Sequence, residues 1–195
     1  MRPVKKPTTV QKLTSVDVTA LKAIVSKVSE SVWNREDSNK ENAFDCFHHT
    51  RHIVFRFIEG MQDHRVSYSR QLWPMWQGAV QPIMDQVVSE YGFAEPEFPK
   101  VMLARLSAGY GIDPHRDGAG SNLYTHKIHI PLFTNSGATF FVDGQSFHLE
   151  EGTAYEVNNL TTHGVRNDGE TDRIHLIFEV FDRALDAASI TTASA

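Results

Sequence analysis

The second half of the chain is a series of short segments with high β-propensity, and this pattern restricts the fold more than any other feature. The segments are rich in β-branched and aromatic residues, and Gly, Asn and Asp residues separate them. Many short strands at such spacing are typical of a sandwich or a barrel. We therefore predict a mainly β protein whose core is a jelly roll of two antiparallel sheets. The predicted strands are 101–106, 127–133, 139–142, 146–149, 154–157, 163–166 and 173–181.

Two helical patterns precede these strands. Between residues 16 and 33, apolar residues recur at spacings of three and four, which indicates an amphipathic helix. A second pattern of this kind runs from 69 to 91, where Pro74 and Pro82 are expected to cause kinks. Between the two, residues 53–58 have the composition of a strand. We expect the two helices to pack on one of the sheets.

The 195 residues are enough to bury a core, so we expect one domain over 1–195. It divides into a loose leader at 1–15, a helical part at 16–92, the jelly-roll core at 93–182 and a frayed tail at 183–195. The net charge of −5 gives no general attraction for nucleic acid or an anionic membrane. A single cysteine and the lack of an apolar signal segment favour a cytoplasmic protein. The sequence does not indicate an oligomeric state.

His115 and Asp117 are the first candidates for chemistry. They stand two positions apart, so on an extended segment both side chains project to the same face while Arg116 points away. Two histidines and one carboxylate form the ligand set of non-haem Fe(II) oxygenases, which leave other coordination positions open. His-x-Asp alone is a common triplet, and its ordinary explanation is a pair of surface residues. The metal hypothesis therefore depends on a second histidine, for which His163 is the candidate.

His163 and Arg173 are equally far from a turn at 167–169. If this turn closes a β-hairpin, the two residues lie opposite each other on paired strands and share one face. Arg173 begins a segment that is apolar on both faces, so we expect its guanidinium to be buried. A buried arginine needs an anionic partner. The partner is either the carboxylate of a ligand or, in a structural role, Glu156 or Glu179.

Other polar residues give weaker signals. His48 and His52 are close in sequence, but they would share a face only on a helix, and a strand is predicted to follow, so no metal site is expected there. His129 shares a strand face with Lys127, and the pair is a candidate second contact for a co-substrate. Substrate contacts are expected from arginines that the sequence does not rank, namely Arg105, Arg116 and Arg166.

Five sequence features follow one another in a fixed order. They are His115-Arg116-Asp117, Lys127-Ile128-His129-Ile130-Pro131-Leu132, Gly152, Thr162-His163-Gly164-Val165-Arg166-Asn167 and Arg173-Ile174-His175-Leu176-Ile177. With them the chain resembles the aspartyl/asparaginyl β-hydroxylase family of Fe(II)- and 2-oxoglutarate-dependent dioxygenases. The resemblance covers residues 100 to 181 and implies a double-stranded β-helix, that is, a jelly roll.

The resemblance also implies roles for single residues. His115, Asp117 and His163 would bind the iron, and Arg173 would bind the distal carboxylate of 2-oxoglutarate. Lys127 and His129 would lie near this co-substrate. Family members usually carry arginine at the position of Lys127, so here a point charge would replace a bidentate fork.

The implied reaction hydroxylates a C–H bond with O2 and 2-oxoglutarate and releases succinate and CO2. The resemblance does not identify the substrate, which is an amino acid, a peptide or a protein side chain. Two alternatives belong to other classes: a cupin-type metal-dependent enzyme that does not use 2-oxoglutarate, and a non-catalytic ligand-binding jelly roll. Arg173 separates them from the main hypothesis, because neither alternative needs an anchor for an oxo-acid.

Overall fold

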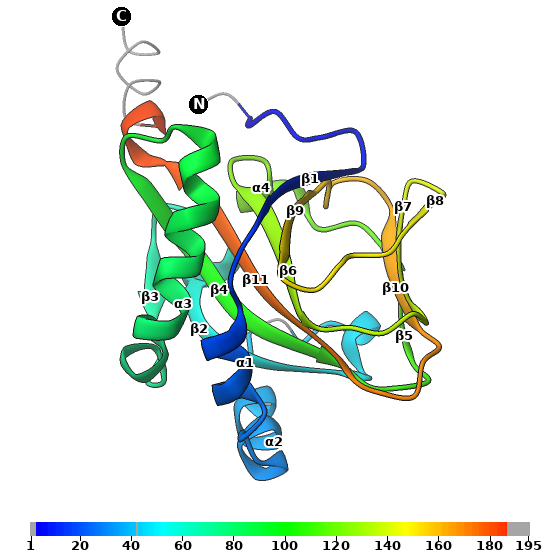
Figure 1. The fold of residues 1–195 in the computed structure, drawn as a ribbon. Coiled ribbons are helices and arrows are strands. Elements are labelled where there is room, and N and C mark those ends of the chain that lie inside the picture. Colours follow the sequence, from blue (N-terminus) through cyan, green and yellow to red (C-terminus); the bar gives the residue numbers. More distant parts are fainter. Residues whose placement is uncertain (1–2, 42, 187–195) are drawn as a thin grey trace, which may run out of the picture.

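The computed structural model describes residues 3–41 and 43–186, and most of its regular structure consists of strands (Figure 1). The strands are β1 (Val10–Ser15), β2 (Thr50–Ile58), β3 (Ser67–Ser69), β4 (Pro96–Leu106), β5 (Gly111–His115), β6 (His126–Phe133), β7 (Ala138–Val142), β8 (Gln145–Phe147), β9 (Thr153–Val157), β10 (His163–Asn167) and β11 (Arg173–Asp182). The helices are α1 (Thr19–Val25), α2 (Glu30–Ser38), α3 (Trp73–Val88) and α4 (Ala119–Asn122), with short 3-10 turns η1 (Asp45–Phe47), η2 (Glu59–Met61) and η3 (Ser89–Tyr91).

The strands form two antiparallel sheets. The larger sheet has the order β1-β9-β6-β11-β4-β2-β3, and the smaller sheet has the order β5-β10-β7-β8. Helices α1 and α3 cover the face of the larger sheet that is turned away from the smaller one (Figure 1). The prediction of a jelly roll with helices on one sheet is therefore confirmed. None of the described helices is long and apolar enough to cross a membrane.

The N-terminal helix predicted at 16–33 is in fact two helices. α1 ends at Val25, and α2 begins at Glu30 after a break. The break has a local cause, because the Ser29 hydroxyl accepts a hydrogen bond from the Val32 N–H and so acts as an N-cap. In α3, Pro74 lies in the first turn, where its missing N–H is tolerated, and the helix continues past Pro82.

Part of the expected loose leader is ordered, which corrects the assignment of 1–15. β1 pairs with β9 at the edge of the larger sheet, with Val10 opposite Val157 and Lys12 opposite Tyr155. Backbone hydrogen bonds make this pairing, so the polar side chains of an edge strand gave little sign of it. The part expected to be helical, 16–92, likewise contributes β2 and β3 to the sheet. Residues 187–195 of the expected frayed tail lie outside the described residues.

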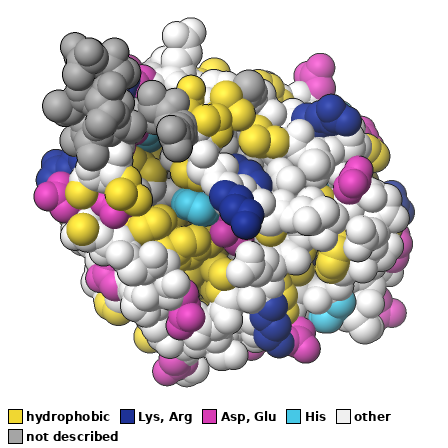
Figure 2. Space-filling model, turned by 90° about the horizontal axis from the view of Figure 1, so that it is seen from above, with side chains coloured by type: hydrophobic (Ala, Val, Ile, Leu, Met, Phe, Trp, Pro, Cys, Tyr) yellow, Lys and Arg dark blue, Asp and Glu magenta, His cyan; other side chains and the backbone are white. Residues whose placement is uncertain are grey.

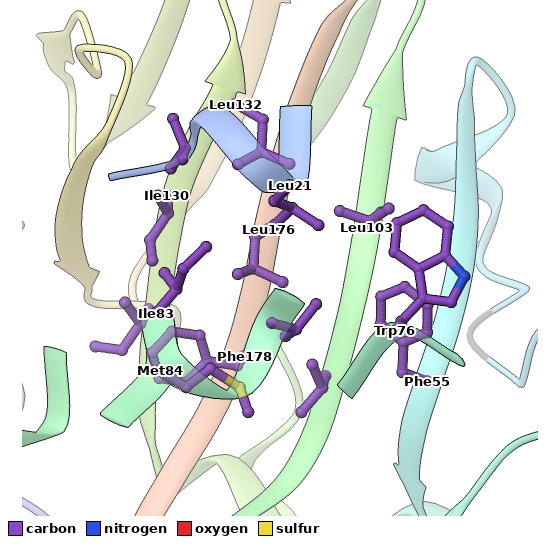
Figure 3. Close-up of a cluster of buried hydrophobic side chains, with 14 of the residues drawn as sticks. Leu21, Phe55, Trp76, Ile83, Met84, Leu103, Ile130, Leu132, Leu176 and Phe178 are labelled. Carbon is purple, nitrogen blue, oxygen red and sulfur yellow. The ribbon is translucent and has the colours of Figure 1, made fainter. Parts of the chain in front are cut away.

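The main hydrophobic core lies between the larger sheet and the helices (Figure 3). α3 contributes buried side chains at spacings of three and four, among them Trp76, Ile83 and Met84. They meet Leu176 and Phe178, which lie on the same face of β11. The alternate residues of β11 face the smaller sheet, so this one strand carries core residues on one side and functional candidates on the other.

We expect Leu176→Ala to lower the free energy of unfolding by about 2–5 kcal/mol, because a fully buried leucine would leave a cavity behind. Leu176 is 0% exposed. Urea unfolding curves measure the change. The control is Met75→Ala on α3, which is 78% exposed and should change stability by no more than about 0.5 kcal/mol. Equal effects of the two substitutions would contradict this assignment of the core.

Candidate active site

A cavity of about 480 Å³ lies between the two sheets, and all six predicted site residues line it. Its remaining wall is largely apolar, with side chains that include Phe57, Met102, Phe140 and Ile177. Seen from above, hydrophobic side chains gather around a histidine and neighbouring basic side chains near the centre of the face (Figure 2). The six predicted residues are His115, Asp117, Lys127, His129, His163 and Arg173.

Three of these residues form a compact group of potential metal ligands. His115 ends β5 and lies opposite His163, the first residue of β10. The Nε2 atoms of His115 and His163 lie 3.7 and 3.8 Å from Oδ1 of Asp117. The ligand atoms of the three residues all lie within 4.8 Å of one another, and no second group of this kind occurs in the described part of the chain. The structure thus brings the three residues together, and their role as metal ligands stays a prediction.

The backbone explains how the two histidines become neighbours. A side chain at Gly164 would place its Cβ 3.0 Å from the carbonyl oxygen of Ile112, and one at Gly111 would place its Cβ 2.8 Å from the carbonyl oxygen of Val165. Real Cβ atoms essentially never come as close as 2.8 Å, and a contact of 3.0 Å would require the neighbouring backbone to shift. The glycine next to His163 thus allows β5 to pair closely with β10.

Both histidines are held in the tautomer that a metal ligand needs. Nδ1 of His115 donates to the carbonyl oxygen of Asp113 at 2.7 Å, and Nδ1 of His163 donates to that of Thr161 at 3.0 Å. Because a carbonyl oxygen only accepts hydrogen bonds, the proton is on Nδ1, and Nε2 keeps its free electron pair. Burial lowers the pKa of His163 to about 4, although Asp117 opposes this, so the imidazole is neutral at physiological pH.

The second oxygen of Asp117 is occupied by donors from the protein. Oδ2 accepts hydrogen bonds from Lys127 Nζ at 2.6 Å and from Asn159 Nδ2 at 2.9 Å. Burial raises the pKa of Asp117, but the charge of Lys127 and the hydrogen bonds from Lys127 and Asn159 outweigh it and hold the pKa below its usual range. The carboxylate is therefore ionised, with Oδ1 facing the histidines.

Lys127 thus has a partner that the sequence did not indicate. Its ammonium group was predicted to contact a co-substrate, and here it donates to Asp117. The contact with a co-substrate stays a prediction. Asn159 was not predicted at all, because it stands in the connection between β9 and β10 and nothing in its neighbourhood marks it as part of a site.

The hairpin predicted around 167–169 does not exist. β10 pairs with β5 and β7 in the smaller sheet, whereas β11 pairs with β4 and β6 in the larger one. The connection between them crosses from one sheet to the other, and the side chain of Asn135 fixes it by donating to Asn167 and to the carbonyl oxygen of Thr171. His163 and Arg173 still reach the same cavity, but they do so from opposite sheets.

Arg173 is buried without an acidic partner. It is 3% exposed, and its Nη2 donates to Nδ1 of His175 at 2.8 Å. Its guanidinium carbon lies 5.9 Å from the ring centre of Phe140. No salt bridge to Arg173 occurs within the described residues, and burial alone lowers its pKa to about 9. The arginine is thus a buried cation in the cavity wall that lacks a counter-charge from the protein.

The alternative partners of Arg173 bind elsewhere. Glu156 accepts a hydrogen bond from Tyr91 and interacts with His126. Glu179 forms a salt bridge of 3.0 Å with Lys100 and accepts a hydrogen bond from Thr125. The structural pairing that the sequence left open is therefore excluded for both glutamates.

His129 offers a further unsatisfied polar atom. It lines the cavity, and its Nδ1 is buried without a hydrogen-bond partner in the described structure. Its ring lies 5.8 Å from that of His175 and 5.4 Å from that of Phe140, measured between ring centres. An uncompensated guanidinium and an unpartnered imidazole nitrogen next to a potential metal site fit a co-substrate that carries carboxylates.

Of the arginines proposed for substrate contact, only Arg116 lines the cavity. Arg105 forms two hydrogen bonds with Glu30 on the helical side of the sheet, and Arg166 pairs with Asp168 at the surface. Among the N-terminal histidines, His52 lines the cavity but is part of no group of potential metal ligands in the described residues.

A jelly roll that holds two histidines and an aspartate beside a buried arginine is typical of the class of non-haem iron oxygenases. The family model described as aspartyl/asparaginyl beta-hydroxylase matches residues 74–183, which is more than half of the chain. The chain belongs to this family, as its motifs predicted, and is a hydroxylase-type enzyme. No curated protein matches the chain.

Solved structures of oxygenases share the fold. A prolyl hydroxylase from Trichoplax adhaerens, in complex with a peptide fragment of the oxygen degradation domain of hypoxia inducible factor, has a TM-score of 0.58 at 12% identity over 92% of this chain and 86% of its own. A 2OG-Fe(II) oxygenase family oxidoreductase from Burkholderia pseudomallei has a TM-score of 0.57 at 15% identity over 89% and 94%. A viral collagen prolyl hydroxylase from Paramecium Bursaria Chlorella virus-1 has a TM-score of 0.51 at 11% identity over 88% and 94%.

Proposed function

We propose that the protein is an Fe(II)- and 2-oxoglutarate-dependent dioxygenase that hydroxylates a C–H bond of its substrate. His115, Asp117 and His163 would hold the metal ion, because two imidazole nitrogens and one carboxylate oxygen are the donor set that suits Fe(II). The observation that carries the proposal is Arg173. A buried guanidinium without an acidic partner in the described residues requires an anion, and the distal carboxylate of 2-oxoglutarate supplies one.

Each residue has a separate task in this proposal. Arg173 binds the planar carboxylate through two parallel N–H groups, which fixes the direction of the co-substrate as well as its position. His129 and Lys127 line the same cavity and would contact the co-substrate there. Phe140 and the other apolar side chains of the wall limit the access of water to the site. When bound, Fe(II) with 2-oxoglutarate and O2 supplies the oxidising chemistry, from which succinate and CO2 are released.

The substrate is proposed to be an amino acid, a peptide or a protein side chain. Three exposed side chains line the cavity: the cationic Arg116 and the apolar Phe44 and Met61. A substrate with an apolar part and an anionic group would match these side chains. The Trichoplax adhaerens enzyme holds a peptide, which supports a place for peptides among the candidates.

The proposal is tested by adding Fe(II) and 2-oxoglutarate to the protein without oxygen. We expect a weak visible absorption band that needs both additions, and we expect succinate to form once air is admitted. A protein that shows neither signal but binds Co(II) would be a metal-dependent enzyme of the cupin type. A protein that shows neither signal and binds no metal would be a ligand-binding jelly roll.

A screen of free amino acids and peptides, with succinate release as the signal, addresses the substrate. Compounds that carry both an apolar part and a carboxylate should raise succinate release most. A response that does not depend on the carboxylate would exclude Arg116 as a substrate contact.

A further inference from the structure

Asn159 holds Asp117 by two hydrogen bonds. Its backbone oxygen accepts from the Asp117 N–H at 3.0 Å, and its side-chain Nδ2 donates to Asp117 Oδ2 at 2.9 Å. Asn159 is 0% exposed, so water does not compete for these bonds. Contacts to both the backbone and the side chain of one residue fix where the carboxylate stands and how it is rotated.

This contact determines which carboxylate oxygen is free. Lys127 and Asn159 both donate to Oδ2, which leaves Oδ1 as the oxygen that faces the Nε2 atoms of His115 and His163. A carboxylate with one oxygen engaged by two donors offers an ion the other oxygen. Asn159 is neutral, so it orients Asp117 without adding a positive charge next to the metal site.

The orientation of the Asn159 amide is set from the N-terminal end of the chain. An asparagine side chain can present either its oxygen or its nitrogen to a neighbour. Lys6 Nζ donates to Asn159 Oδ1 at 2.9 Å, so the oxygen must face Lys6 and the nitrogen must face Asp117. The second N–H of the amide donates to Oδ1 of Asn122 at 3.2 Å. All polar atoms of the Asn159 amide are thereby engaged.

We call residues 3–9 the N-terminal arm, and the structure ties it to the site at several points. The N–H of Val4 donates to the carbonyl oxygen of Leu123 at 2.9 Å. Lys6 Nζ also donates to the carbonyl oxygen of Thr125. The carbonyl oxygen of Thr9 accepts from the N–H of Asn158 at 2.8 Å. The arm is thus fixed next to the segment that carries Asn159, although its composition predicted a loose leader.

We propose that Asn159 is a positioning residue for Asp117 and that Lys6 of the N-terminal arm sets the orientation of its amide. The arm then completes the metal site without touching the ion. This inference rests on the proposed function in one respect, because it takes Asp117 to be a metal ligand.

The test measures Co(II) binding by its visible absorption, which needs neither 2-oxoglutarate nor turnover. We expect Asn159→Ala to raise the Kd for Co(II) by roughly 10- to 100-fold, which is the effect of removing a hydrogen-bond partner of a metal ligand. We expect Lys6→Met to raise the Kd for Co(II) by about threefold to tenfold, because Asn159 is kept but its amide can turn. Lys6→Arg should restore an affinity within about twofold of the original protein. Lys5→Met is the control, since Lys5 is exposed on the same arm.

The sign of the Lys6→Met effect separates positioning from simple electrostatics. Removing a positive charge near a dication strengthens its binding if charge alone matters, whereas loss of positioning weakens it. The inference is overturned if Lys6→Met binds Co(II) as well as or better than the original protein, or if folded Asn159→Ala binds it within about twofold. Lys6 is only half-buried on the arm, so Lys6→Met decides the question alone if Asn159→Ala does not fold.

The control experiments distinguish failure of the inference from failure of the proposed function. If the original protein binds no Co(II), both are overturned. If it binds Co(II) and the variants at Asn159 and Lys6 bind it equally well, the metal site stands and the positioning role is rejected. Thermal melts of the metal-free variants show whether a lost affinity reflects lost folding.

Discussion

We expect His163→Ala to abolish both metal binding and succinate formation, while His148→Ala leaves both at the original level. His163 supplies one of the three ligand atoms that lie within 4.8 Å of one another. Its loss should reduce metal affinity by more than the roughly 10- to 100-fold that follows when only a partner behind a ligand is lost. Co(II) titration measures the affinity, and succinate release in air measures the reaction.

His148 is a matched control because it directly follows β8, a strand of the smaller sheet that also contains His163, but does not line the cavity. Its Nδ1 interacts with the carbonyl oxygen of Ala138, and its side chain is exposed. A thermal melt of His163→Ala without metal tests for lost folding, since His163 packs against His115 and Phe140. If the two alanine variants lost metal affinity equally, His163 would not be the second histidine ligand.

The second large effect is expected for Arg173→Met, which should weaken the binding of 2-oxoglutarate and leave the binding of Co(II) unchanged. Truncating one partner of a buried, hydrogen-bonded charge pair costs about 2–5 kcal/mol, or a roughly 30- to 5,000-fold higher Kd. The visible band of the protein with Fe(II) and 2-oxoglutarate, titrated without oxygen, gives this Kd. Arg173→Lys should have a Kd for 2-oxoglutarate between those of the original protein and of Arg173→Met. The reason is that an ammonium keeps the charge but cannot bind a carboxylate through two parallel donors.

Stability provides an independent test of the role of Arg173. The arginine has no acidic partner within the described residues, so without 2-oxoglutarate its replacement by Met removes an uncompensated buried charge and should not destabilise the fold. Arg105→Met is the contrast: Arg105 is also buried, but it forms two hydrogen bonds with Glu30 and lies 4.7 Å from the ring centre of Trp33. That variant should destabilise the fold and keep the Kd for 2-oxoglutarate. The opposite result would assign Arg173 a structural role.

The fold class was predicted correctly from the sequence, because β-propensity and turn residues are local signals. Sequence reasoning also reached His115 and Asp117 as a pair, since side chains two positions apart share a face on any extended segment. It missed β5 as a strand, although this strand carries His115. It also assumed one helix at 16–33, because the apolar spacing continues past Ser29, the residue whose side chain caps a second helix.

The sequence by itself determined which residues are the candidate metal ligands and which arginine is the candidate anion-binding residue, because these predictions depend on residue type and on order along the chain. Only the tertiary structure decided that His163 and Arg173 reach one cavity from two different sheets, because strand pairing depends on which faces are buried rather than on the nearest turn. It also decided the partners of Asp117. Asn159 stands 42 positions from Asp117 and 153 from Lys6, and contacts over such separations leave no mark on local patterns.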